Sequence, residues 1–158
     1  MREAREAIRQ GDIPGVQLRR RQDLALGPAE AWRWLVEPER LCLWLAEEAR
    51  IAGDREEELL LRITGDRGEP VRERGRILGT IPATLWVLSF ERLEAGWTAP
   101  TRLTLRLAAT PAGCELDVLQ EGFQRLPLSL GLTAWESYRV RWRTALARLA
   151  AAVPLRSA

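Results

Sequence analysis

The carboxy-terminal stretch 134–153 limits what this chain can fold into more than any other segment. Its apolar residues recur at helical spacing over about five turns and form one stripe. The stripe consists of Trp135, Tyr138, Trp142, Leu146, Leu149 and Val153. A stripe this long and aromatic needs a broad apolar partner, and the only candidate upstream is a series of alternating strands. We therefore expect one long helix across a curved sheet, with Arg141 and the other helix arginines pointing elsewhere.

The composition is typical of one globular domain. The chain has 158 residues, of which 46% are hydrophobic and 29% charged, so it can bury a sizeable core. Its 24 basic residues are all arginine, and the net charge of +2 is too small and too evenly spread to indicate nucleic acid. No segment approaches the roughly 20 apolar residues of a membrane-spanning helix. We expect neither a nucleic-acid nor a membrane partner.

Cys42 and Cys114 are the only thiols, and each has apolar neighbours. We predict both as small core residues rather than a disulfide or reactive thiols. This usage fits a reducing cytoplasm, and residues 1–12 lack the apolar run of a signal peptide. Residues 1–15 are expected to form a helical arm that packs on the surface or contributes to a homodimer. The main domain then spans 16–153, and 154–158 form a tail.

Residues 16–26 alternate as a first strand, which places Arg20 and Gln22 on its apolar side. Two alternatives remain open: both side chains face inward and need a partner or ligand, or the strand bulges and both reach solvent. Two short helices follow, one starting at Pro28 and one at Pro38. We expect four of their side chains to point inward and cover one end of the sheet, namely Trp32, Leu35, Leu41 and Trp44.

Six further segments predict an antiparallel meander, because parallel pairing would need crossover connections. These strands are expected at 47–53, 57–64, 71–80, 84–91, 101–109 and 114–123. Gly75 and Gly79 suggest bends or bulges in the third of them. The leucine-rich segment 126–132 either covers a cavity mouth or begins the long helix early. The fold class is α+β.

This order of elements resembles the helix-grip fold of the START and birch-pollen-allergen superfamily, often abbreviated SRPBCC. Within it, the local matches are most similar to the domain related to the activator of the heat-shock protein 90 ATPase. The matching segments are PAEAWRW (28–34), PERLCLW (38–44), GRILGTIPATLWVLSF (75–90), LDVLQEGF (116–123) and WRTALARL (142–149). Arg141 replaces a residue that is often small in that family, and Gln120 replaces a common histidine. The resemblance implies a fold with an apolar cavity enclosed by helix and sheet.

The available chemistry argues against a conventional enzyme. The chain has no His and no Lys, so the commonest general base and the Schiff-base nucleophile are missing. It also lacks the usual catalytic and phosphate-loop motifs, and we expect no catalytic residue, no metal and no cofactor. Glu73 is in phase with apolar neighbours, and we expect it to face inward beside Arg20 as a structural ion pair. Gln120 faces the interior, where it either bonds nearby backbone or contacts a ligand.

We therefore expect the chain to bind a small hydrophobic or amphipathic ligand between the carboxy-terminal helix and the sheet. The predicted cavity residues share an inward phase and are Arg20, Gln22, Trp44, Glu73, Trp86, Leu88, Phe90, Gln120, Trp135, Tyr138 and Trp142. Two other functions stay open by analogy with the fold. One is a chaperone-associated interaction module with a protein partner, and the other is a cyclase or hydrolase.

Overall fold

The computed structural model describes residues 11–157, with side chains described as far as Val153. Most of the predicted amino-terminal arm lies outside the described residues. The element order is β1 (Gln17–Leu24), α2 (Pro28–Val36), α3 (Pro38–Leu41), β2 (Glu48–Ala52), β3 (Glu58–Thr64), β4 (Pro70–Ile81), β5 (Leu85–Arg92), β6 (Thr101–Thr110), β7 (Gly113–Glu121), a 3₁₀ turn (Phe123–Arg125) and α4 (Leu128–Ser157). This order confirms the predicted α+β class.

Seven strands form one antiparallel sheet in the order β1-β7-β6-β5-β4-β3-β2. Strands β2 to β7 pair with their neighbours in sequence, as the predicted meander requires. Strand β1 pairs with β7, with Leu18 opposite Gln120, and no strand within residues 11–157 pairs with β1 on its other side. The sheet therefore stays open, and its two edges are β1 and the short strand β2. This architecture, a curved sheet gripped by a long helix, is consistent with a helix-grip fold.

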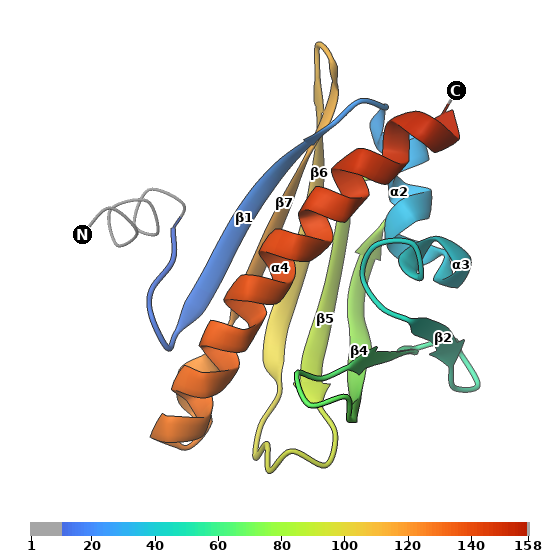
Figure 1. Cartoon of the computed structure of the whole chain (residues 1–158). Helices are drawn as coiled ribbons and strands as arrows, with labels where there is room; N and C mark the ends of the chain where they lie inside the picture. The colour runs from blue at the N-terminus through green and yellow to red at the C-terminus, as the bar shows by residue number, and fades with distance from the viewer. Residues whose placement is uncertain (1–10, 158) are drawn as a thin grey trace.

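Helices α2, α3 and α4 lie on one face of the sheet (Figure 1). Helix α4 crosses that face and packs against β1, while α2 and α3 cover the sheet near the carboxy-terminal end of α4. The helix begins at Leu128, so segment 126–132 largely starts the helix early, one of the two expected outcomes. Gly131 permits this start, because a Cβ atom there would lie 2.6 Å from the carbonyl oxygen of Phe123.

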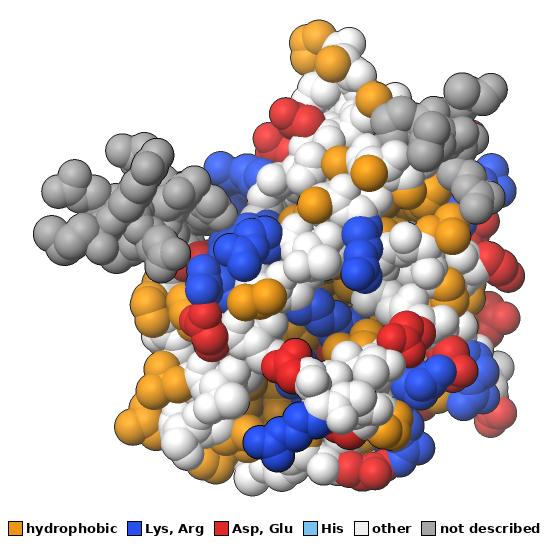
Figure 2. Space-filling view, viewed as in Figure 1, with side chains coloured by type: hydrophobic (Ala, Val, Ile, Leu, Met, Phe, Trp, Pro, Cys, Tyr) orange, Lys and Arg blue, Asp and Glu red, His pale blue; other side chains and the backbone are white. Residues whose placement is uncertain are grey.

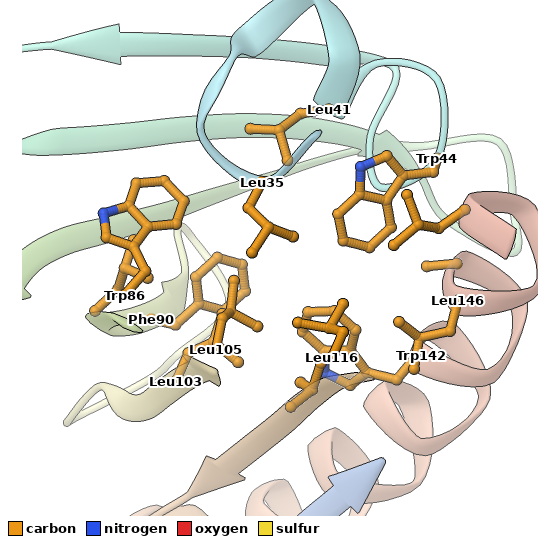
Figure 3. Close-up of a cluster of buried hydrophobic side chains, with 14 of the residues drawn as sticks. Leu35, Leu41, Trp44, Trp86, Phe90, Leu103, Leu105, Leu116, Trp142 and Leu146 are labelled. Atoms are coloured by element: carbon orange, nitrogen blue, oxygen red, sulfur yellow. The ribbon is translucent and has the colours of Figure 1, made fainter. Parts of the chain in front are cut away.

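The inner faces of the strands and the stripe of α4 form one core (Figure 3). Alternation along β6 and β7 buries every second residue, as predicted. The pairing of β4 with β5 shifts register between Ile77 and Gly79, which confirms a bulge near the predicted glycine. Gly75 lies on the inner face, where a Cβ atom would meet the carbonyl oxygen of Ser89 at 3.1 Å. A bare backbone at this position lets β4 approach β5 closely.

One burial prediction was wrong. Cys42 is exposed and lies in the turn that follows α3, whereas Cys114 is buried as expected. On α2, Trp34 is the fully buried tryptophan, at 1% exposure, and Trp32 is only partly buried. Trp32 packs edge-on against Trp86 with ring centroids 6.4 Å apart. Trp32 thus packs against the core, as expected, although it stays partly exposed.

Candidate functional site

An open cleft of about 560 Å³ lies between α4, the α3–β2 link (residues 42–47) and the β3–β4 hairpin. Its apolar lining consists of Leu43, Trp44, Leu45, Ala46, Ile63, Val71, Val140 and Ala145. Its basic lining consists of Arg92, Arg141 and Arg148. Figure 2 shows basic side chains in a recess beside α4 and acidic side chains on the surface near it. The cleft therefore combines an apolar wall with a cationic wall.

A buried carboxylate, Glu73 of β4, lies behind the cationic wall and is 0% exposed. Three side chains surround its Oε2 atom, and we call the four residues together the carboxylate cluster. Tyr138 donates its hydroxyl and Arg141 donates Nη1 to Oε2, and Nε of Arg92 lies 3.9 Å from it. Glu73 and Arg92 are direct cross-strand neighbours in the β4–β5 pairing. The sheet register and one face of α4 therefore build the cluster.

Two further contacts fix the guanidinium groups of the cluster. Arg92 donates from Nε to the Tyr138 hydroxyl at 3.2 Å and from Nη2 to the Ser137 hydroxyl at 2.9 Å. Its guanidinium also lies over the Tyr138 ring, 4.5 Å from the centroid. Arg141 donates from Nη2 to the carbonyl oxygen of Leu45 at 3.1 Å. This last bond ties the α3–β2 link to α4.

The surroundings of the cluster shift two pKa values. Burial raises the pKa of the Tyr138 hydroxyl, and the negative charge of Glu73 raises it further. Burial alone would lower the pKa of Arg141, but the charge and hydrogen bond of Glu73 outweigh it, so the pKa of Arg141 is raised. Tyr138 therefore remains a neutral donor and Arg141 a cation at neutral pH. The Oε1 atom of Glu73 has no hydrogen-bond partner within the described part of the chain.

The acidic residues of the cleft lie on the opposite wall, at the hairpin and the strand that approaches it. Glu47 accepts a hydrogen bond from the Thr64 hydroxyl at 2.9 Å and lies 3.7 Å from Arg62. Glu69 accepts the backbone N–H of Arg67 at 2.9 Å, which closes the hairpin turn. Both carboxylates are therefore engaged with their own neighbours. The third acidic residue of the cleft, Asp66, is exposed in the same hairpin. The cleft thus has one acidic and one basic side.

The structure separates the eleven predicted cavity residues into three places. Trp44 lines the cleft, and Glu73 and Tyr138 lie directly behind it in the carboxylate cluster. The largest group is buried in the core between α4 and the sheet and comprises Trp86, Leu88, Phe90, Gln120 and Trp142. The remaining residues, Arg20, Gln22 and Trp135, lie at or against β1. The eleven residues therefore do not surround one space. Only Trp44, Glu73 and Tyr138 lie together, at or directly behind the cleft.

The predicted ion pair between Arg20 and Glu73 was wrong. β1 and β4 are separated by three strands in the sheet, so the two side chains do not meet. Arg20 instead bonds Asp12 at 2.7 Å, a residue that is itself 4% exposed, in the turn before β1. Gln22 bonds the backbone carbonyl of Asp23 and is partly exposed. Neither of the two alternatives holds for both residues: Arg20 is largely buried and paired, Gln22 is partly exposed, and β1 pairs with β7 without a bulge.

Gln120 bonds two side chains rather than nearby backbone. Its Oε1 accepts the indole N–H of Trp142 at 2.8 Å, and its Nε2 donates to the Thr101 hydroxyl at 3.1 Å. The hydroxyl of Thr101 donates to the carbonyl oxygen of Phe90 at 2.7 Å. Gln120 therefore connects α4 to the sheet through the core.

The sequence did not identify Arg92 and Arg141 as site residues. Arg141 lies three positions after Tyr138, on the flank of the apolar stripe, and its side chain is only 12% exposed. Two signals were present: an inward Glu73 needs a cation, and Arg141 departs from the small residue that the similar family favours. The contact joins residues 68 positions apart, so spacing alone could not reveal it.

Two structural features are absent from the part of the chain described. Residues 11–153 contain no group of three or more His, Cys, Asp or Glu side chains arranged to hold a metal ion. No helix within residues 11–157 has the length and apolarity needed to cross a membrane. The cleft is lined by arginines, carboxylates, hydroxyls and apolar side chains.

Comparisons with solved structures show the fold. Protein CV1439 from Chromobacterium violaceum is 22% identical, with a TM-score of 0.68 over 87% of this chain and 97% of its own. Protein NE0264 from Nitrosomonas europaea is 14% identical, with a TM-score of 0.71 over 92% and 99%. Protein Ms6760 from Mycobacterium smegmatis is 11% identical, with a TM-score of 0.72 over 89% and 92%. The matches span nearly whole chains.

No family model and no curated protein matches the sequence. At identities of 22% and below, the similarity to solved structures establishes the arrangement of sheet and helices and not an activity. The chain is thus an antiparallel sheet-and-helix protein whose fold is shared with bacterial proteins of known structure.

Proposed function

We propose that this chain binds a small hydrophobic or amphipathic molecule in the cleft between α4, the α3–β2 link and the β3–β4 hairpin. The observation that carries the proposal is the cleft itself, which has about 560 Å³ of space and combines an apolar wall with polar and charged side chains. Small-molecule sites occupy roughly 300–1,000 Å³ and combine these features. The cleft lies beside the long helix, whereas the sequence predicted a cavity between that helix and the sheet, where core side chains are buried instead.

The SRPBCC resemblance supports the same function. The sequence motifs cover about residues 16–153, and the order of strands and helices is consistent with the helix-grip fold. We propose that the chain is a member of this superfamily, most similar to the domain related to the activator of the heat-shock protein 90 ATPase. A ligand-binding role agrees with the absence of His and Lys from the sequence.

Native mass spectrometry of the protein purified from its own cells tests the proposal. A reproducible adduct of one small molecule per chain is expected, and extraction then identifies that molecule. Thr144 lines the cleft and Arg143 does not, although both are exposed on α4. Thr144→Trp should therefore remove the adduct, whereas Arg143→Trp should retain it. No adduct in the unmodified protein, or equal loss in both variants, would count against a ligand in the cleft.

A second candidate function is a protein-interaction module. Apolar side chains near the start of α4 are exposed, with Leu128 at 80% and Leu132 at 46%. Ile13, in the turn before β1, is also exposed, at 49%. The similarity to the chaperone-activator domain makes the cognate heat-shock protein 90 the partner to test. Stimulation of its ATPase that Leu128→Glu abolishes would support this candidate, and an unchanged ATPase rate would exclude it.

A further inference from the structure

The carboxylate cluster carries more positive than negative charge. Two guanidinium groups, those of Arg92 and Arg141, surround the single carboxylate of Glu73, and Tyr138 is neutral because burial raises its pKa. The side chains of Arg92 and Arg141 are 18% and 12% exposed, so water screens them poorly. One positive charge is therefore left without a partner inside the cluster. Buried or partly buried charges are costly unless a counter-charge approaches them.

The excess charge faces the cleft. Arg92, Arg141 and Ser137 all line it, and the exposed Arg148 extends the same wall two turns further along α4. Nε and Nη2 of Arg92 are used by Tyr138 and Ser137, while no bond joins Nη1 to another of the described side chains. The acidic residues Glu47, Asp66 and Glu69 lie on the opposite wall, where Glu47 and Glu69 are held by their own neighbours and Asp66 is exposed in the hairpin turn. The cationic wall is thus available to a ligand.

We infer that the ligand of the cleft carries a single negative charge, such as a carboxylate, which lies against Arg92 and Ser137 near Arg148. The apolar part of the ligand then lies along Leu43, Leu45 and Val140. This inference rests on the proposed binding function and adds the chemical class of the ligand. A monoanion matches the one unbalanced charge of the cluster that water screens poorly, since Arg148 is exposed and its charge is screened. Guanidinium groups bind carboxylates through charge-assisted hydrogen bonds.

The test uses four probes that share one apolar chain and differ in head group: decanoate, 1-decanol, decylammonium and decyl phosphate. Titration calorimetry with the purified full chain measures each affinity. Decanoate should bind at least about tenfold more tightly than decanol, and decylammonium should bind more weakly than decanol. Decyl phosphate distinguishes a carboxylate ligand from a phosphate ligand. If only one positive charge is unbalanced, the dianion should bind little more tightly than decanoate. Binding of the phosphate about tenfold tighter than decanoate would overturn the monoanion assignment.

Matched arginine variants locate the head group. Arg92→Gln and Arg148→Gln should each weaken decanoate binding, by about tenfold for Arg92, and leave decanol binding unchanged. Arg143→Gln removes the same charge from α4 outside the cleft and should change neither affinity. Circular dichroism checks that each variant is folded. If Arg92→Gln does not fold, Arg148→Gln still tests the position of the head group, since Arg148 is exposed and its replacement should not disturb the fold.

The outcomes distinguish this inference from the proposed function. Equal affinity for decanoate, decanol and decylammonium would overturn the anionic class and leave ligand binding in the cleft intact. A decanoate preference that Arg143→Gln abolishes as fully as the cleft variants would also overturn the assigned place of the anion. Absence of binding by all four probes up to about 1 mM would overturn both the inference and the proposed function.

Discussion

The indole N–H of Trp142 donates to Oε1 of Gln120 at 2.8 Å, which joins α4 to β7 inside the core. Trp142 is 2% exposed and Gln120 is 0% exposed. The tryptophan therefore contributes both apolar burial and the partner of a buried amide, and different substitutions separate these two contributions.

Trp142→Ala should lower the free energy of unfolding by about 3–5 kcal/mol, because it removes a large buried side chain and leaves a cavity. Trp142→Phe keeps much of the ring but leaves Gln120 Oε1 without its donor, at a cost of about 1–3 kcal/mol. Urea denaturation measures both. A loss below about 1 kcal/mol for Trp142→Ala would contradict a central core position.

Arg141→Met should destabilise the fold strongly, because it leaves the fully buried Glu73 with Arg92 and Tyr138 alone. Breaking a buried ion pair from one side costs about 3–5 kcal/mol, and the remaining Arg92 places this variant near the lower end. Arg143→Met changes an exposed arginine on the same helix and should alter stability by less than about 0.5 kcal/mol. Equal losses in the two variants would contradict a structural role for the Glu73–Arg141 contact.

The stability of the protein should fall above about pH 10. Burial raises the pKa of Tyr138 above its ordinary value of 10.0, so below pH 10 both folded and unfolded chains keep the phenol protonated. As pH rises further, only the unfolded chain loses this proton, and the free energy of unfolding decreases by about 1.4 kcal/mol per pH unit. Since Tyr138 is the only tyrosine, tyrosinate absorbance follows it alone.

Two controls isolate this effect. Burial also raises the pKa of Cys114 above its ordinary value of 9.0. The free energy of unfolding therefore also decreases from about pH 9 upward because only the unfolded chain loses the thiol proton there. Cys114→Ala removes that contribution, and the chain has no lysine to titrate in this range. In that background, Tyr138→Phe should flatten the remaining slope between about pH 10 and 11.5. Tyrosinate formation near pH 10 in the folded protein would contradict the buried phenol.

Cys42 should react with iodoacetamide in the folded protein, whereas Cys114 should react only after unfolding. The first thiol is exposed and lines the cleft, and the second is buried with its pKa raised by burial. Mass spectrometry should therefore show one modification per folded chain and two in urea. A ligand in the cleft should slow the modification of Cys42, and Cys42→Ser should leave the folded protein unmodified. Rapid modification of both thiols would contradict the described burial.

Local periodicity predicted most of the fold. The inward residues of β6, β7 and α4 follow from periods of two and 3.6, and Pro28 and Pro38 correctly marked both short helices. The burial of Glu73 was predicted from its phase with Gly75 in β4. These features depend on residues close in sequence, so the local spacing of apolar residues is enough to predict them.

The partners of the polar groups could not be predicted in the same way. Whether Glu73 meets Arg20 or Arg141 depends on the number of strands between β1 and β4 and on the angle at which α4 crosses the sheet, and neither quantity appears in local spacing. Cys42 was misplaced because α3 lasts only one turn, so its helical phase does not continue to residue 42. The cleft was missed for the related reason that three distant segments form it.

The bond from Arg141 to the carbonyl oxygen of Leu45 joins two parts of the molecule that should open independently. Helix α4 packs along β1 over the long strands, whereas the edge strand β2 is held mainly by β3 and α3, and Arg141 bonds only the link that leads into it. Regions with few fixed contacts open before the rest of a protein does. Amide hydrogen exchange should therefore be slow in the long strands of the sheet and fast in β2 and the link before it. A ligand would then enter beside β2 and its link while the hydrophobic core stays folded.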